Sequence, residues 1–162
     1  MRVAITVAGI VVASASFAAQ DPSPRRAEMK SQTHAIVFDA PRAKAFEVIS
    51  NIENLPKWAV VFCQGLERRG GRWWVKTRGG ELMFRIDADA KTGVVDMSVG
   101  PSEDQMQLAP GRVVGLPDGR SLFLFTLIQY PGLTDEAFKA QCVPLVDREF
   151  PELKRLVEGA KR

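Results

Sequence analysis

Apolar residues recur at two different spacings along this chain, and the change between those spacings predicts a mixed α+β domain. Residues 33–39 read THAIVFD, a short run of β-branched and aromatic residues typical of a strand. Residues 41–58 then carry an apolar face at helical spacing, formed by Ala45, Phe46, Ile49 and Ile52. Asn51 interrupts this helix and a further short turn ends at Trp58. We therefore expect two short helices after the first strand.

Glycine-turned hairpins are predicted next. Residues 59–67 form the expected second strand, which would carry Cys63. Gly79-Gly80 lies between two further strands and suits a two-residue loop, because both central residues of such a loop need positive φ. This loop predicts that Val75 pairs with Phe84.

Alternation within this hairpin separates two faces of the sheet. The face expected to be buried contains Trp73, Val75, Thr77, Leu82, Phe84 and Ile86. The face expected to be solvated contains Trp74, Lys76, Arg78, Glu81, Met83 and Arg85. An antiparallel sheet with one wet side has this pattern.

The remaining chain predicts more strands and a long final helix. Residues 92–99 alternate as a strand, and residues 105–116 read as one strand bent at Pro110-Gly111. Residues 121–129 are apolar on both faces, which indicates a central strand or one flanked by the final helix, and the pattern leaves its inward face open. Thr134 is a good N-cap for a helix that ends near Gly159. Two prolines inside this helix predict a kink or break near residue 143.

These elements together resemble the START-like, or SRPBCC, superfamily. The resemblance covers residues 33–158 and rests on the apolar strand, the helix opening at Pro41, the corner Asn54-Leu55-Pro56-Lys57-Trp58, the hairpins and the final helix. It implies a helix-grip fold, in which a curved antiparallel sheet wraps around a long C-terminal helix. This superfamily includes bacterial polyketide cyclase/dehydrase relatives, and its members use an internal cavity for unrelated purposes.

The N-terminus has the layout of a secretory signal peptide over residues 1–18. Arg2 supplies the positive start, residues 3–15 are apolar or small, and Ser16-Phe17-Ala18 offers small residues at the cleavage-defining positions. The alternative is an uncleaved membrane anchor. We expect a periplasmic or secreted protein with no stable membrane insertion after cleavage. Residues 19–32 then form a flexible leader, and residues 33–160 form the folded domain.

Composition and motifs exclude several function classes. The chain has 162 residues, 25% of them charged, and a formal net charge of +3 without a dense basic stripe interleaved with aromatic residues. Nucleic-acid binding is therefore not expected. No phosphate loop, zinc-ligand spacing or dinucleotide glycine pattern occurs, so we expect no metal and no cofactor. His34 is the only histidine and reads as a partly exposed edge residue. Cys63 and Cys142 could form a disulfide, but separate buried thiols are favoured.

No catalytic residue emerges from these patterns, and the expected site is a hydrophobic cavity. The inward positions that would line it are Phe62, Trp73, Phe84, Met97, Met106, Phe123, Phe125 and Phe138. Such a lining suits a lipid, a sterol-like molecule or a polyketide as the bound partner. The same residues would equally suit a packed core.

Three functions follow from the sequence. The first is binding of a hydrophobic small molecule, and the second is a cyclase or dehydratase of the same fold. The third is a filled-core interaction domain that presents its wet sheet face to a protein. A buried polar group with a shifted titration would favour the enzyme. A cavity below about 300 Å³ would favour the interaction domain. The sequence identifies neither a protein partner nor an oligomeric state.

Overall fold

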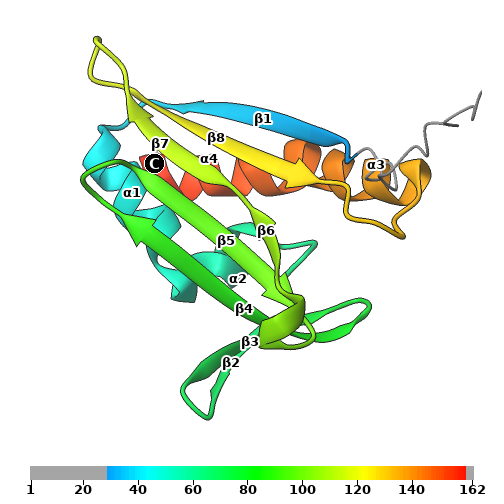
Figure 1. The fold of residues 1–162 in the computed structure, drawn as a ribbon. Coiled ribbons are helices and arrows are strands. Elements are labelled where there is room, and N and C mark those ends of the chain that lie inside the picture. Colours follow the sequence, from blue (N-terminus) through cyan, green and yellow to red (C-terminus); the bar gives the residue numbers. More distant parts are fainter. Residues whose placement is uncertain (1–28, 160–162) are drawn as a thin grey trace, which may run out of the picture.

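The computed structural model describes residues 29–159, which form an antiparallel sheet bent around one long C-terminal helix (Figure 1). The predicted signal peptide and residues 19–28 of the predicted leader lie outside the described residues. The first strand begins at Ser31, two residues before the expected start of the domain. Along the sheet the strand order is β1-β8-β7-β5-β4-β3-β2, and β6 pairs with β5 beside this path. The predicted α+β helix-grip architecture is confirmed.

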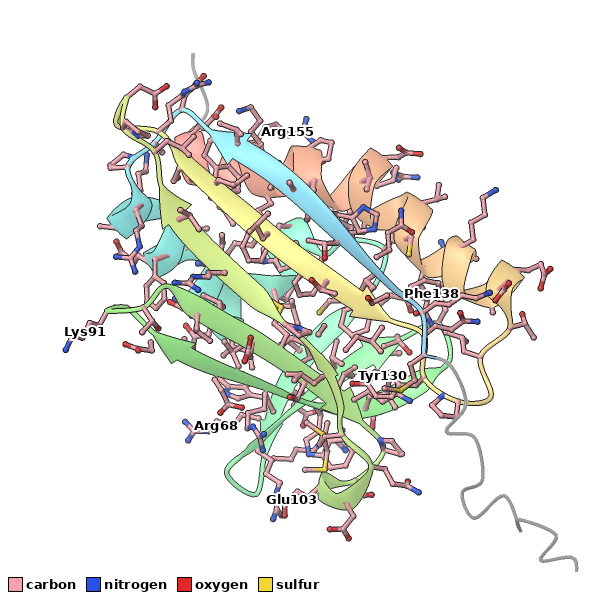
Figure 2. The ribbon with its side chains drawn as sticks, turned by 45° about the horizontal axis from the view of Figure 1, so that its top comes forward. Arg68, Lys91, Glu103, Tyr130, Phe138 and Arg155 are labelled. Atoms are coloured by element: carbon pink, nitrogen blue, oxygen red, sulfur yellow. The ribbon has the colours of Figure 1, made fainter. Side chains whose placement is uncertain are left out.

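The strands have the following bounds: β1 Ser31–Phe38, β2 Gly65–Arg69, β3 Arg72–Thr77, β4 Gly80–Asp89, β5 Val94–Gly100, β6 Gln107–Ala109, β7 Gly111–Gly115 and β8 Ser121–Ile128. Strand β8 lies between β1 and β7, as its apolar sequence predicts. Its buried positions are Ser121, Phe123 and Phe125. Pro110 separates β6 from β7 at the expected bend. Tyr130, which is labelled in Figure 2, holds the β6 edge. Its hydroxyl accepts from the Leu108 N–H at 2.7 Å and donates to the Leu108 carbonyl at 2.9 Å.

The helices have the following bounds: α1 Arg42–Ser50, the 3₁₀ turn η1 Ile52–Asn54, α2 Leu55–Trp58, the 3₁₀ turn η2 Glu103–Gln105, α3 Asp135–Pro144, the π-helical turn η3 Leu145–Glu149 and α4 Phe150–Glu158. The broken helix after β1 is therefore confirmed. Asn51 accounts for the break, because its side-chain Oδ1 accepts a hydrogen bond from the Glu53 N–H and starts a new turn.

The segment predicted as a strand over residues 59–67 is wrong in its first part. Residues 59–64 form a loop, and β2 begins only at Gly65. The backbone N–H groups of Val61 and Phe62 donate to the Glu149 carboxylate on the final helix, so they are not available to a neighbouring strand. A tertiary contact therefore overrides the local β-propensity of this apolar run. Cys63 lies in this loop, which we call the 59–64 loop.

The hairpin of β3 and β4 has the predicted faces but a different register. Trp73 pairs with Phe84 and Thr77 pairs with Gly80, so the loop residues are Arg78 and Gly79. The Thr77 hydroxyl explains the shift, because it accepts from the Gly79 N–H and donates to the Gly80 carbonyl. A register shift by two residues leaves every side chain on its predicted face.

One position on the expected wet face of this hairpin is nevertheless buried. Met83 is only 8% exposed, although it alternates with the inward-facing residues Leu82 and Phe84. Trp74, on the same outer face, is partly covered by the Arg69 guanidinium, whose carbon lies 4.9 Å from the ring centroid. The outer face therefore has a covered apolar portion, and it is less solvated than its sequence pattern predicts.

The long helix begins at the predicted residue, and a π-helical turn takes the place of the expected kink or break. The Thr134 hydroxyl accepts from the Ala137 N–H, which caps α3. After Pro144 the chain continues through the π-helical turn η3, in which the Phe150 N–H donates to the Leu145 carbonyl. The wider turn accommodates the nearby prolines, and π-turns of this kind are one cause of helix distortion. It also rotates the side chains, so Val146 is exposed and Glu149 is buried.

Candidate ligand-binding cavity

A cavity of about 450 Å³ lies between the concave side of the sheet and the first part of the long helix. It is bounded by α2, the 59–64 loop, the β3–β4 hairpin, β5, β6, β8 and the helical residues of α3 and η3. The lining residues are Leu55, Trp58, Ala59, Val61, Phe62, Thr77, Arg78, Gly79, Leu82, Phe84, Met97, Val99, Gln107, Ala109, Phe125, Leu127, Gln141, Leu145 and Glu149. Its volume lies within the range of small-molecule sites in proteins, which begins at about 300 Å³.

The structure distributes the eight sequence-predicted cavity residues over three places. Phe62, Phe84, Met97 and Phe125 line this cavity. Trp73 and Met106 line a separate hollow, to which Phe84 also contributes. Phe123 and Phe138 line neither of these spaces. Whether any of these residues contacts a ligand stays a prediction.

Phe123 is a packed core residue for a clear reason. Its side chain is fully buried, and its ring centroid lies 5.7 Å from that of Phe125 and 6.3 Å from that of Phe150. Aromatic pairs at such distances favour tilted or offset packing, which fills the space between sheet and helix. Phe138 is buried on α3. Figure 2 shows it near the C-terminal end of β8.

Glu149 is the buried charged residue among those that line this cavity, and the sequence patterns did not predict its role. Its residue is only 6% exposed, and its Oε1 atom accepts from the Val61 N–H at 3.0 Å and from the Phe62 N–H at 2.7 Å. These bonds join the long helix to the 59–64 loop. Burial raises the pKa of the Glu149 carboxyl, while the two backbone hydrogen bonds act in the opposite direction to a smaller extent.

A signal for Glu149 exists in the sequence, but it is weak. Leu145, Glu149 and Leu153 follow one another at intervals of four, so an acidic residue stands within the apolar stripe of the helix. The prolines obscured this spacing, because a kink near residue 143 would have changed which positions face the sheet. Burying a charge costs free energy. A charged residue within an apolar stripe therefore indicates a candidate site residue.

The mouth of the cavity is polar. Arg78 in the hairpin loop, Gln107 on β6 and Gln141 on α3 are exposed residues at its edge. The Arg78 guanidinium has no ion-pair partner within the described part of the chain. An apolar interior with polar groups near its entrance is a common arrangement in ligand-binding sites.

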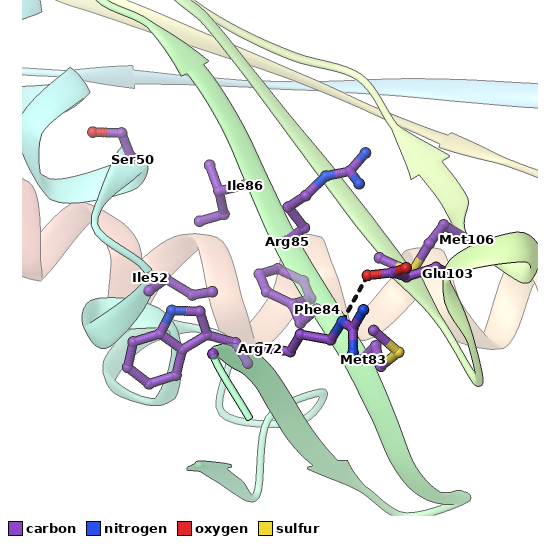
Figure 3. Close-up of a pocket in the computed structure, with 11 residues that line it drawn as sticks. Ser50, Ile52, Arg72, Met83, Phe84, Arg85, Ile86, Glu103 and Met106 are labelled. Atoms are coloured by element: carbon purple, nitrogen blue, oxygen red, sulfur yellow. Dashed lines mark hydrogen bonds and ion pairs between the residues drawn. The ribbon is translucent and has the colours of Figure 1, made fainter. Parts of the chain in front are cut away.

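The second hollow, of about 250 Å³, lies at the end of β3 beside β4. Figure 3 shows the Arg72 side chain pointing toward Glu103, with an ion pair of 2.6 Å between Nε and Oε1. Phe84 and Ile86 lie on the other side of β4 in this view. The hollow is smaller than typical ligand sites, and an exposed ion pair lies beside it. We therefore regard the larger cavity as the candidate site.

The remaining titratable candidates lie elsewhere or form no constellation. His34 on β1 is half-buried, its Nε2 is buried without a hydrogen-bond partner within residues 29–159, and burial lowers its pKa. Cys63 and Cys142 are buried free thiols, and burial raises the pKa of each. In the described part of the chain no group of three histidine, cysteine or carboxylate residues could hold a metal ion.

None of the helices between residues 29 and 159 is long and apolar enough to span a bilayer.

Solved structures share the fold of this chain at low sequence identity. No family model matches this sequence, and no curated protein is significantly similar to it in sequence. Solved structures do match. Norcoclaurine synthase from Thalictrum flavum has a TM-score of 0.59 and 14% identity, over 83% of this chain and 96% of that one.

Two further structures show the same similarity. The ZhuI aromatase/cyclase from Streptomyces sp. R1128 has a TM-score of 0.54 and 18% identity, over 83% of this chain and 99% of that one. Aha1 from Colwellia psychrerythraea has a TM-score of 0.60 and 17% identity, over 82% and 99%. These likenesses agree with the helix-grip fold that the resemblance implied, and they concern the fold alone. Identities this low carry no function, because one fold hosts many unrelated functions.

Proposed function

We propose that this protein binds a hydrophobic small molecule in the cavity between the sheet and the long helix. The observation that carries the proposal is the cavity of about 450 Å³, whose interior is formed mainly by aliphatic and aromatic side chains. Burial of apolar ligand surface there would contribute roughly 25 cal/mol per Å² before the costs of association are subtracted. The size of the cavity argues against the filled-core interaction domain.

Filling the cavity with a side chain tests this proposal. In Ala109→Phe, a ring would occupy the space beside Met97, because Ala109 is partly buried and lines the cavity. The matched control is Ala35→Phe, the same substitution at an exposed strand position. We expect methylnaphthalene to bind the wild type and Ala35→Phe and to bind Ala109→Phe at least tenfold more weakly, as measured by titration calorimetry. Equal affinities for all three proteins would place binding outside this cavity.

Acid–base catalysis on the bound molecule is the second candidate, and Glu149 is the observation that favours it. A carboxyl group whose pKa is raised by burial can serve as a proton donor or acceptor nearer to neutral pH. The solved aromatase/cyclase and norcoclaurine synthase share the fold. Binding remains the better-supported function, because Glu149 is the one carboxylate among the residues that line the described cavity. Conversion of a bound molecule by the wild type but not by Glu149→Gln would establish the enzyme instead.

The proposal also includes export, and the support for it is the sequence of residues 1–18. Native mass spectrometry of the protein from its own host tests the location and the ligand together. We expect a mature mass that begins near residue 19 together with a hydrophobic adduct. An intact N-terminus would contradict export without affecting the binding proposal.

A further inference from the structure

We propose that the ligand carries a neutral hydroxyl group, as in an alcohol or a phenol, which donates a hydrogen bond to the Oε2 atom of Glu149. This inference rests on the proposed function, because it concerns the same cavity. It assigns Glu149 as the residue that selects and orients the ligand.

The first observation is that only one of the two carboxylate oxygens is used by the protein. Oε1 accepts both backbone hydrogen bonds from the 59–64 loop, at 3.0 and 2.7 Å. Oε2 has no hydrogen-bond partner among the described residues, and part of its surface is accessible. Since Glu149 lines the cavity and is 94% buried, Oε2 is open to the cavity. A carboxylate oxygen without a partner in an apolar space is an acceptor available to a ligand.

The second observation is that the rest of the interior offers no comparable acceptor. The interior side chains are hydrocarbon, apart from the Met97 thioether, a weak acceptor, and the Trp58 indole, which can only donate. The Thr77 hydroxyl is already engaged with the backbone of its own hairpin loop. The other polar lining side chains, Gln107, Gln141 and Arg78, are exposed at the mouth. A donor on a deeply bound ligand would therefore be satisfied best at Glu149.

The number of hydrogen-bond donors on a ligand group decides which chemical class of ligand fits this cavity. An ammonium group has three N–H donors, and in this lining most of them would be left without acceptors. An unsatisfied buried donor costs free energy, and a carboxylate ligand would be repelled by the ionised form of Glu149. A hydroxyl has one donor, which matches one open oxygen. The geometry therefore favours a neutral alcohol or phenol over an amine or an acid.

The charged and titratable groups near Glu149 come from two other elements. Arg78 lines the cavity from the hairpin loop, and Cys63 approaches from the 59–64 loop, where its thiol donates to the Gly65 carbonyl at 3.4 Å. Burial raises the pKa of the Cys63 thiol, and the negative charge of Glu149 contributes to that rise, so the thiol is neutral through the acid range. A change in ligand preference below neutral pH would therefore report the titration of Glu149.

A pair of probes tests the assignment. Naphthol and methylnaphthalene share an apolar body and differ in a hydroxyl against a methyl group of similar size. We expect the wild type to bind naphthol about tenfold more tightly at a pH above the titration of Glu149, because a hydrogen bond to an ionised group is strong. As the pH is lowered through the titration of Glu149, the preference should fall to about threefold, because a neutral pair is roughly half as strong.

Glu149→Gln is the informative variant, because its amide oxygen can still accept from Val61 and Phe62 while the negative charge is removed. The amide Nε2 takes the place of Oε2 and can only donate, so the ligand hydroxyl would accept a neutral hydrogen bond from it instead of donating one. We therefore expect the smaller, threefold preference for naphthol over methylnaphthalene at every pH. The matched control is Glu136→Gln on the exposed side of α3, which should behave like the wild type. Thermal unfolding checks that each variant is folded. If Glu149→Gln does not fold, the pH series on the wild type still tests the assignment.

The outcomes separate the inference from the function on which it rests. If neither probe binds the wild type, the proposed function fails. If both probes bind the wild type with equal affinity, the cavity binds apolar molecules and the role of Glu149 is wrong. A preference that is unchanged by acid and by Glu149→Gln would also overturn the assignment, because the hydroxyl would then be recognised elsewhere.

Discussion

The two ends of the long helix meet the same sheet in different ways. At the α4 end, Leu153 and Val157 are fully buried in a core that also contains Phe38, Ile49 and Phe123. At the α3 and η3 end, the buried residues Leu145 and Glu149 border a cavity of about 450 Å³. The helix side chains that face the sheet are buried at both ends, but only one end is filled. Burial of a side chain therefore does not by itself indicate a packed core.

The 59–64 loop accounts for much of this difference. At the α4 end the sheet strand β1 runs directly beside the helix, and the Lys154 ammonium donates to the Val37 carbonyl at 2.8 Å. At the other end the loop, the hairpin and the helix each form one wall, and Glu149 holds the loop in place. Walls contributed by separate segments leave space between them. This comparison predicts different responses to the same substitution at the two ends.

The largest expected effects come from truncating the two aromatic residues Phe123 and Phe84. Phe123→Ala should lower the free energy of unfolding by about 4 kcal/mol, because it removes a fully buried ring from the filled end. Phe84→Ala should cost about 3 kcal/mol, since its ring already borders two hollows, and it should weaken methylnaphthalene binding. Urea unfolding and calorimetry measure both effects. Unchanged stability and binding in Phe84→Ala would mean that the inward face of this hairpin is assigned wrongly.

A smaller difference is expected between two leucines on the helix. Leu153→Ala should cost about 3 kcal/mol, because a new cavity is created in a filled core. Leu145→Ala should cost about 2 kcal/mol, since the removed atoms enlarge a space that already exists. Urea unfolding of both variants under one set of conditions gives the comparison. Equal costs would show that the cavity end is packed as tightly as the α4 end.

The smallest effects concern the pH dependence of stability, in which the half-buried His34 and the buried Glu149 should act in opposite directions. Burial lowers the pKa of His34 below its usual 6.5, so the unfolded chain binds the proton more readily. Its contribution to stability is present above that pH and is lost as the pH falls through the lowered pKa. Burial raises the pKa of Glu149 above 4.5, so its contribution is present below that value and is lost as the pH rises through the raised pKa.

Two neutral variants separate these contributions. Relative to the wild type, His34→Gln should gain stability in acid, and Glu149→Gln should gain stability toward neutral pH. Urea unfolding across the range from about pH 4 to about pH 8 provides the measurement. Parallel pH profiles of the wild type and both variants would contradict the burial of these two groups.

Much of the fold was predictable from local patterns, and the error in the 59–64 loop has a tertiary cause. The helix break at Asn51 and the Thr134 cap depend on hydrogen bonds between residues close in sequence, and both are present. The faces of the β3–β4 hairpin depend on alternation, which survives a register shift by two. The 59–64 loop and the rotation of the helix at η3 depend on distant contacts or on neighbouring prolines, and local patterns did not predict them.

The candidate site follows the same division. Phe62, Phe84, Met97 and Phe125 were predicted as cavity residues because apolar alternation marks the inward side of a strand. The same pattern could not separate them from Phe123, which packs between sheet and helix. The side of the sheet to which a side chain points is set by local alternation. Whether that side chain borders a cavity depends on the distance between the sheet and the elements that face it.

The sequence by itself determined the class of fold, the order of its elements and the apolar character of the interior. Tertiary structure alone decided that the interior is hollow at one end and that Glu149 faces into the hollow. The physical reason is the range of the interactions. Helix caps and alternating faces arise from groups a few residues apart, which a linear pattern contains. The cavity and its carboxylate arise from Glu149 meeting Val61 and Phe62 across 88 and 87 residues of chain.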